Sequence, residues 1–182
     1  MTPAPSDSWT SGPGAPGERR VHLAAFVLPV HEGRVLLARH SYGPALWAMV
    51  GGAVQEDESV EAAARREVLE ETGLGVETDR MVGFADRSDL SLYVFSGRVV
   101  EGLPDSPTPQ AGEIQELRWF TAEELAGATD VFEMARLLGA GLLAVGAGGG
   151  GWTRRELTWP SGEVVPVYLD LGGSGPATAA AT

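Results

Sequence analysis

Residues 52–74 read GAVQEDESVEAAARREVLEETGL, a stretch that combines a turn, an acidic loop and a helix. Gly51 and Gly52 are expected to form a tight turn, because glycine tolerates positive φ. Ser59 is a suitable N-cap, and the alanines that follow it favour a helix. Gly73 is suited to end that helix in a left-handed conformation. We therefore predict one helix between Ser59 and Gly73.

Three glutamates share one face of this predicted helix. Glu67, Glu70 and Glu71 are spaced i, i+3 and i+4, so their carboxylates project together and repel one another. A hard divalent cation such as Mg²⁺ would offset this repulsion, because it prefers oxygen ligands. An acidic helix face that is merely solvated is the alternative interpretation.

The same stretch resembles the Nudix box, G-x5-E-x7-R-E-U-x-E-E-x-G-U, in which U is an apolar residue. The seven fixed positions are Gly52, Glu58, Arg66, Glu67, Glu70, Glu71 and Gly73, and Val68 and Leu74 fill the apolar ones. At average residue frequencies, such a match arises by chance about 10⁻⁸ times per window. The resemblance implies an α+β fold, a Nudix-type α/β/α sandwich around a mixed β-sheet. Val50 replaces the proline that usually precedes the two glycines, which is expected to loosen the turn.

The resemblance also implies roles for individual residues. The expected catalytic residues are Arg66, Glu67 and Glu70. The expected cation ligands are Glu67, Glu70, Glu71, the carbonyl of Gly51 and an acid from the loop before the last core strand. Arg66 is expected to orient Glu67, since a planar guanidinium suits bidentate pairing. Whether Glu67 is the general base or only a ligand stays open.

Other candidate residues lie outside this helix face. Glu113 is the expected loop acid and Glu116 is its competitor, with a solvated loop acid as the alternative. Arg39, Gly52 and Glu58 are assigned to the substrate side of the site. Arg39 is expected near the phosphates, and Glu58 is expected to fix the loop before the helix or to accept a hydrogen bond there.

The implied activity is metal-dependent hydrolysis of a phosphoanhydride bond, with Mg²⁺ as cofactor and Mn²⁺ as a substitute. Two substrate classes stay open. One is a nucleoside diphosphate linked to another moiety, of the ADP-ribose or nucleotide-sugar type, and the other is a nucleoside triphosphate. A non-catalytic Nudix domain that senses a nucleotide or binds a partner is the alternative, although such domains usually lose box carboxylates.

Composition excludes several other classes of function. The net charge of −12 argues against a nucleic-acid polymer as partner, because backbone binding needs clustered Lys and Arg. The absence of cysteine excludes disulfides and thiolate metal sites. No apolar run reaches transmembrane length, and the N-terminus lacks the features of a signal peptide. We therefore expect a cytoplasmic protein without a membrane partner.

The expected organisation is one domain with appended segments. The segments are a disordered tail at 1–20, a Nudix hydrolase domain at 21–145, a Gly-rich linker at 146–151, an appended C-terminal β-hairpin at 152–171 and a disordered tail at 172–182. An isolated hairpin is only marginally stable. We expect this one to pack on the core or on a second subunit, as in a homodimer.

Secondary structure within the domain follows the hydrophobic pattern. The expected strands are 21–30, 34–39, 47–50, 76–85, 91–100 and 116–120. Thr121 and Glu124 form a capping box that opens a short helix. A second helix is expected over 130–145.

Overall fold

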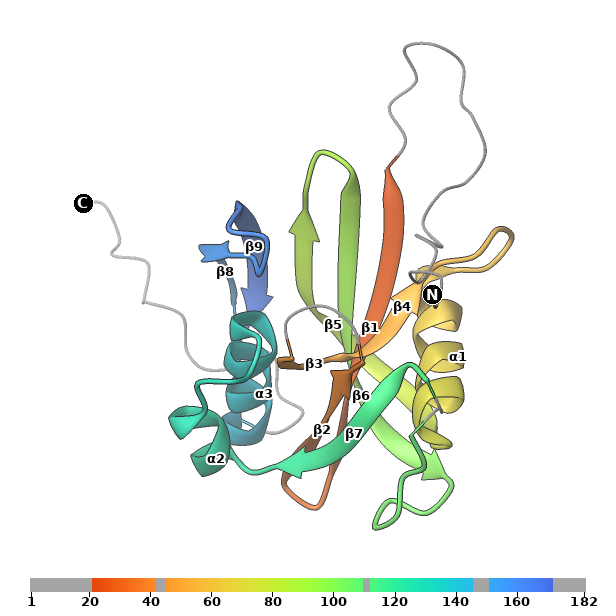
Figure 1. Ribbon diagram of the computed structural model, residues 1–182. Helices are drawn as coiled ribbons and strands as arrows, with labels where there is room; N and C mark the ends of the chain where they lie inside the picture. The colour runs from red at the N-terminus through yellow and green to blue at the C-terminus, as the bar shows by residue number, and fades with distance from the viewer. Residues whose placement is uncertain (1–20, 42–44, 110–111, 146–150, 172–182) are drawn as a thin grey trace, which may run out of the picture.

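The computed structural model describes residues 21–41, 45–109, 112–145 and 151–171 (Figure 1). The strands are β1 (His22–His31), β2 (Arg34–His40), β3 (Trp47–Ala48), β4 (Val50–Ala53), β5 (Gly75–Asp86), β6 (Leu90–Glu101), β7 (Ile114–Phe120), β8 (Trp152–Thr158) and β9 (Val164–Asp170). The helices are α1 (Val60–Thr72), α2 (Ala122–Gly127) and α3 (Glu133–Val145). The predictions of disorder for 1–20 and 172–182, and nearly all of the predicted linker, lie outside the described residues.

All of these strands belong to one mixed sheet with β1 near its centre. The strand order is β3-β2-β1-β6-β5-β9-β8, with β4 paired to β1 and β7 paired to β2. β1 runs parallel to β6 and antiparallel to β2 and β4. β4 pairs with the first half of β1 and β2 with its end, and α1 follows β4 along the chain.

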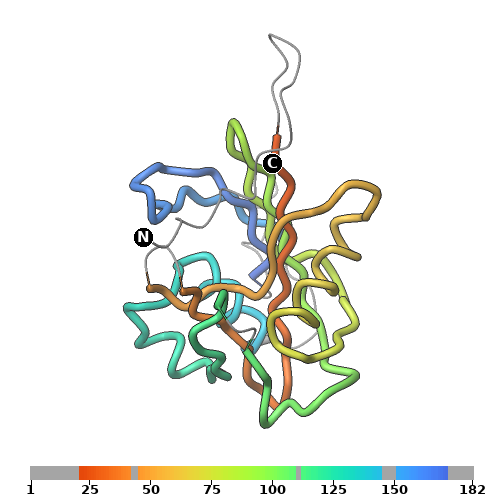
Figure 2. Tube along the Cα trace, turned by 45° about the vertical axis from the view of Figure 1, so that its right-hand side comes forward, coloured from red at the N-terminus to blue at the C-terminus, as the bar shows by residue number. Residues whose placement is uncertain are grey.

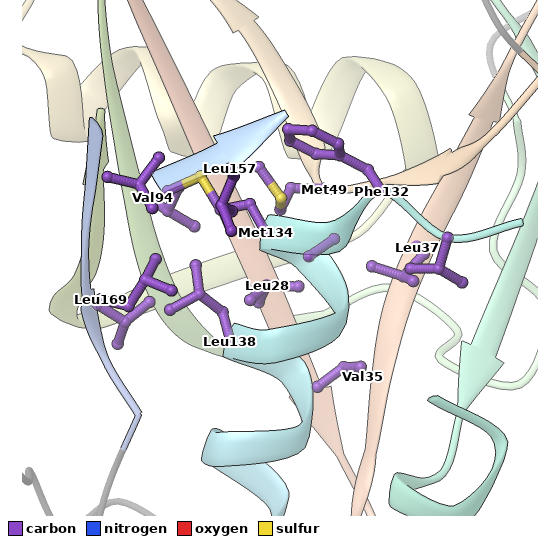
Figure 3. Packing of buried hydrophobic residues seen from close by; sticks show 14 of the residues in the cluster. Leu28, Val35, Leu37, Met49, Val94, Phe132, Met134, Leu138, Leu157 and Leu169 are labelled. Atoms are coloured by element: carbon purple, nitrogen blue, oxygen red, sulfur yellow. The ribbon is translucent and has the colours of Figure 1, made fainter. Parts of the chain in front are cut away.

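Helices cover both faces of this sheet. In Figures 1 and 2, α1 lies beside β1 and β4, whereas α2 and α3 lie on the opposite side. Ala63, Ala64 and Val68 of α1 pack in one apolar cluster, and Met134 and Leu138 of α3 pack in another. Figure 3 shows the second cluster between α3 and the sheet. The predicted α/β/α sandwich is therefore confirmed.

Both ends of α1 carry the predicted caps. The Ser59 hydroxyl accepts the Ala62 amide at 3.1 Å, which satisfies one of the free N–H groups of the first turn. Gly73 has φ of 70° and its amide donates to the Leu69 carbonyl at 3.0 Å. The predicted helix bounds are correct because these signals are local to the sequence.

The two glycines before the acidic loop do not form the predicted tight turn. They lie within β4, where Gly51 is opposite Phe26 and Gly52 opposite Ala25. Only Gly51 has a positive φ, 147°, and a Cβ there would lie 2.3 Å from the Ala25 carbonyl oxygen. The expected strand 47–50 is accordingly divided into β3 and β4. Gly51 is needed for close approach to β1, not for a turn.

Two further predicted boundaries are corrected. α3 begins at Glu133 rather than at residue 130, because the preceding segment is bonded to β3. Trp47 donates its amide to the Asp130 carbonyl at 2.9 Å, and Phe132 donates to the Trp47 carbonyl at 2.8 Å. β7 begins at Ile114, two residues earlier than expected, through pairing with His40.

The C-terminal hairpin packs on the core of its own chain, one of the two predicted arrangements. β9 pairs with β5, which adds β8 and β9 to the edge of the sheet. Its inward side chains join the cluster beneath α3, and they are Leu157, Val165, Val167 and Leu169. Asp170 of β9 is buried and forms an ion pair with Arg80 of β5. The hairpin is thus part of the main sheet.

Candidate active site

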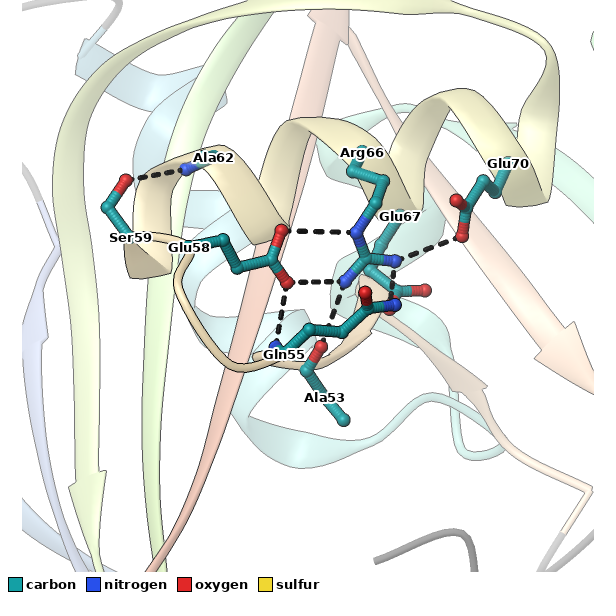
Figure 4. Close-up of polar contacts among 8 residues, drawn as sticks. All are labelled: Ala53, Gln55, Glu58, Ser59, Ala62, Arg66, Glu67 and Glu70. Atoms are coloured by element: carbon teal, nitrogen blue, oxygen red, sulfur yellow. Dashed lines mark hydrogen bonds and ion pairs between the residues drawn. The ribbon is translucent and has the colours of Figure 1, made fainter.

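Arg66 is the centre of the polar contacts on α1 (Figure 4). Its Nη2 and Nε donate to the two carboxylate oxygens of Glu58 at 2.7 and 3.2 Å. Its Nη1 donates to Glu67 at 2.8 Å and to Glu70 at 3.0 Å, and Nη2 also reaches the Ala53 carbonyl at 3.1 Å. These contacts, led by that with Glu58, raise the pKa of Arg66. One guanidinium therefore fixes three carboxylates and the end of β4.

Glu58 is held in the loop between β4 and α1. Its carboxylate accepts the Gln55 amide at 2.8 Å in addition to the two bonds from Arg66. The hydrogen bonds from Arg66 are the main reason why the pKa of Glu58 is lowered. These are the contacts of a residue that fixes a loop, and they occupy both carboxylate oxygens.

Glu67 lies directly over Gly52. A Cβ at Gly52 would be 2.8 Å from the Glu67 Cδ atom, so a side chain there would displace the carboxylate. Burial raises the pKa of Glu67, the bonds from Arg66 oppose this, and the charges of Glu70 and Glu113 raise it further. The glycine at position 52 therefore leaves room for this carboxylate against β4.

Glu71 is the most deeply placed of the acidic side chains on α1. It is only 3% exposed, and its Oε2 accepts the Gly51 amide at 3.0 Å. Burial raises the pKa of Glu71 to about 8, against the bond from Gly51, and the charges of Glu67, Glu113 and Glu70 add to the increase. Burial and neighbouring like charges both disfavour the ionised form. A cation at this position would favour it.

The segment that carries Glu113 lies close to α1, because Ile114 packs in the same apolar cluster as Val68. Glu113 immediately precedes β7, and its charge acts on both Glu67 and Glu71. Its competitor Glu116 lies within β7, opposite Arg39 of β2. The loop acid predicted first therefore interacts electrostatically with the acidic face of α1, and its role as a cation ligand stays a prediction.

Arg39 of β2 is already engaged with two other side chains. Its Nη2 donates to Asp130 at 2.8 Å, and its guanidinium lies 4.7 Å from the centre of the Trp47 ring. Sequence reasoning missed Asp130, which is 91 positions away and carries no motif. A phosphate that bound to Arg39, as predicted, would therefore have to compete with the Asp130 carboxylate.

The donor set at this site suits a hard cation. Glu67, Glu70, Glu71 and Glu113 offer carboxylate oxygens beside the backbone of Gly51, and Mg²⁺ binds oxygen ligands. As they lie, no three His, Asp or Glu side chains in the described parts of the chain converge closely enough to hold an ion. The contacts above explain this, because Arg66 draws two of the carboxylates to itself. The ligand types fit Mg²⁺, and binding requires side chains to turn.

Fold and site together define a class of protein, and comparison with known families identifies it. The NUDIX domain model matches residues 19–138. The chain belongs to the Nudix family.

Its relatives include proteins of known name. The chain is 36% identical over 113 residues to the oxidized purine nucleoside triphosphate hydrolase of Danio rerio, covering 57% of this chain and 68% of that protein. The protein of the same name from Mus musculus is 35% identical over 111 residues, with the same coverage. Phosphatase NudJ of Escherichia coli K12 is 27% identical over 116 residues, covering 60% of this chain and 74% of NudJ.

Solved structures support the fold. A NUDIX hydrolase from Nitrosomonas europaea matches with a TM-score of 0.60 at 20% identity, covering 70% of this chain and 72% of that one. A MutT NUDIX hydrolase from Burkholderia pseudomallei matches with a TM-score of 0.56 at 24% identity, covering 64% and 94%. None of the helices in the described residues has the length and apolar character needed to span a membrane.

Proposed function

We propose that this chain is an Mg²⁺-dependent pyrophosphohydrolase whose substrate is a nucleoside triphosphate. The observation that carries the proposal is the arrangement of three carboxylates on one face of α1. Arg66 holds Glu67 and Glu70, and Glu71 is buried against the Gly51 amide. Burial and neighbouring like charges disfavour the ionised form of these carboxylates, and a bound cation would favour it.

Each residue of the site has a role in this proposal. Bound Mg²⁺ supplies charge neutralisation on phosphate oxygens and a more acidic water. Arg66 keeps the Glu67 carboxylate in one orientation through a bond of 2.8 Å, and Glu58 keeps Arg66 in place through two bonds. Glu67 either holds the cation or accepts the proton of the attacking water. Glu70 and Glu71 are ligands in both schemes.

The relatives support one of the two substrate classes. The Danio rerio and Mus musculus proteins are named as hydrolases of oxidized purine nucleoside triphosphates, and each is at least 35% identical to this chain. Both matches exceed that to NudJ in identity. We therefore favour a nucleoside triphosphate over a nucleoside diphosphate linked to a sugar.

The test is a panel of nucleotides incubated with purified protein and Mg²⁺ or Mn²⁺, with products identified by mass. The panel contains ordinary and oxidized purine triphosphates, ADP-ribose and a nucleotide sugar. We expect turnover of a triphosphate, which Glu70→Gln abolishes and Glu61→Gln does not, because Glu61 is an exposed partner of Arg65 on the same helix. Tight binding without any product would instead identify a nucleotide sensor.

A further inference from the structure

Ser41 makes two hydrogen bonds to the segment that carries Glu113. Its amide donates to the Glu113 carbonyl at 2.8 Å. Its hydroxyl donates to the Gly112 carbonyl at 2.6 Å. One residue at the end of β2 thus fixes two successive carbonyl groups just before β7.

The backbone at this place is irregular and depends on such contacts. The pairing of β2 with β7 shifts register between Arg39 and His40, so that His40 lies opposite Ile114. Gly112 has φ of 97°, in the region that favours glycine. The regular ladder of strand hydrogen bonds therefore ends at Ile114, and the bonds from Ser41 continue it by two residues.

These contacts fix the backbone position from which the Glu113 side chain extends. Ile114, the residue after Glu113, packs in the same apolar cluster as Ala64 and Val68 of α1, which brings this segment close to the helix. The charge of Glu113 also raises the pKa of both Glu67 and Glu71. We propose that Ser41 is a positioning residue, whose hydroxyl holds the Gly112–Glu113 backbone so that Glu113 completes the cation ligands offered by α1. This inference rests on the proposed function.

The test measures the affinity of the protein for Mn²⁺ in the absence of substrate. Titration with protein lowers the paramagnetic signal of the free ion as the ion binds. Substitution of residues that orient a metal ligand typically weakens metal affinity about 10- to 100-fold. For Ser41→Ala we expect the lower end, about tenfold, because the backbone amide still donates to Glu113. Ser41→Thr keeps the hydroxyl and should restore most of the affinity.

A double-mutant cycle separates positioning from general stability. If Ser41 acts through Glu113, adding Ser41→Ala to Glu113→Gln causes no further loss of Mn²⁺ affinity, since coupled residues are not additive. Thr121→Ala is the matched control, because it removes a hydroxyl that caps α2, away from Ser41. It should lower the melting temperature and leave Mn²⁺ affinity unchanged.

Three results would overturn the inference. They are wild-type Mn²⁺ affinity in Ser41→Ala, an additive loss in the double variant, and wild-type affinity in Glu113→Gln. The last result would remove Glu113 from the ligands. Nucleotide turnover by the wild-type protein would still support the proposed function in each case, so the two proposals can fail separately.

Discussion

At the scale of single residues, the site depends on how one guanidinium is shared. Arg66 donates hydrogen bonds to Glu58, Glu67, Glu70 and the Ala53 carbonyl. All three nitrogens of its planar guanidinium group take part. Lysine has one compact ammonium group and cannot reproduce this geometry. We therefore expect position 66 to require arginine for the orientation of Glu67, beyond its positive charge.

Arg66→Lys should lower kcat/KM by about 10- to 100-fold, the range seen when a group that orients a metal ligand is lost. The measurement is steady-state hydrolysis of the identified nucleotide, together with the melting temperature. Arg65→Lys is the control, because Arg65 is more exposed and pairs with Glu61 and Thr78 on the outer side of α1. Equal activity losses in the two variants would contradict a specific role for Arg66.

The two glycines of β4 should respond differently to alanine. At Gly52 the new Cβ would meet the Glu67 carboxylate at 2.8 Å, a side chain that can move, so activity should fall with little loss of stability. At Gly51 the Cβ would meet the Ala25 carbonyl at 2.3 Å, and φ is 147°. Gly51→Ala should therefore destabilise the protein by about 1–3 kcal/mol. Urea unfolding and kinetics on both variants decide this, and the reverse pattern would contradict the assignment.

The sequence predicted those site residues whose position follows from one helix. Glu67, Glu70 and Glu71 lie on a common face because the helical period is local information. The pairing of Arg39 with Asp130 joins residues 91 positions apart, and only the folded sheet brings them together. Pairs of this kind carry no signal in a single sequence.

At the scale of elements, local signals and long-range pairing differ in how well they could be predicted. α1 has the predicted bounds because Ser59 and Gly73 act within one turn of its ends. Only the first residue of β4, Val50, was predicted as strand, and Gly51 and Gly52 were predicted as a turn, since consecutive glycines have low strand propensity. The pairing of β4 with β1 is a contact between distant parts of the sequence. The local sequence therefore gave no sign that the two glycines lie in a strand.

Gly141 of α3 should be sensitive to alanine because the helix touches the end of the hairpin there. A Cβ at this position would lie 2.4 Å from the Leu171 carbonyl oxygen, a backbone atom that cannot easily move. Gly141→Ala should cost about 1–3 kcal/mol of unfolding free energy, as for other overpacked contacts. Urea unfolding measures this cost.

Gly127 of α2 provides the control for that variant. No atom lies within 4 Å of its added Cβ. Gly127→Ala should leave stability unchanged or raise it by up to about 1 kcal/mol, the helix preference of alanine over glycine. A Gly141→Ala protein as stable as Gly127→Ala would show that α3 does not rest on the chain after β9.

At the scale of the whole molecule, the fold places a costly group of acidic side chains on α1 beside β4, which pairs with the central strand β1. The chain has a net charge of −12, and Glu71 is buried among further carboxylates. The second core cluster and the paired hairpin contribute apolar burial on the other face of the sheet. That burial offsets the cost of the acidic site. We therefore infer that these carboxylates serve catalysis at the expense of stability.

Glu71→Gln tests this claim most directly. The amide keeps the shape of the side chain and an oxygen that can accept the Gly51 amide, but unlike the carboxyl group it cannot ionise to bind a cation. We expect the rate of nucleotide hydrolysis to fall about 10²-fold or more, since cation-borne stabilisation is worth several kcal/mol and each 1.36 kcal/mol is a factor of ten. The metal-free variant should melt at or above the wild-type temperature, measured on the same preparations. Near wild-type turnover, or a loss of activity that merely follows a loss of stability, would contradict the account.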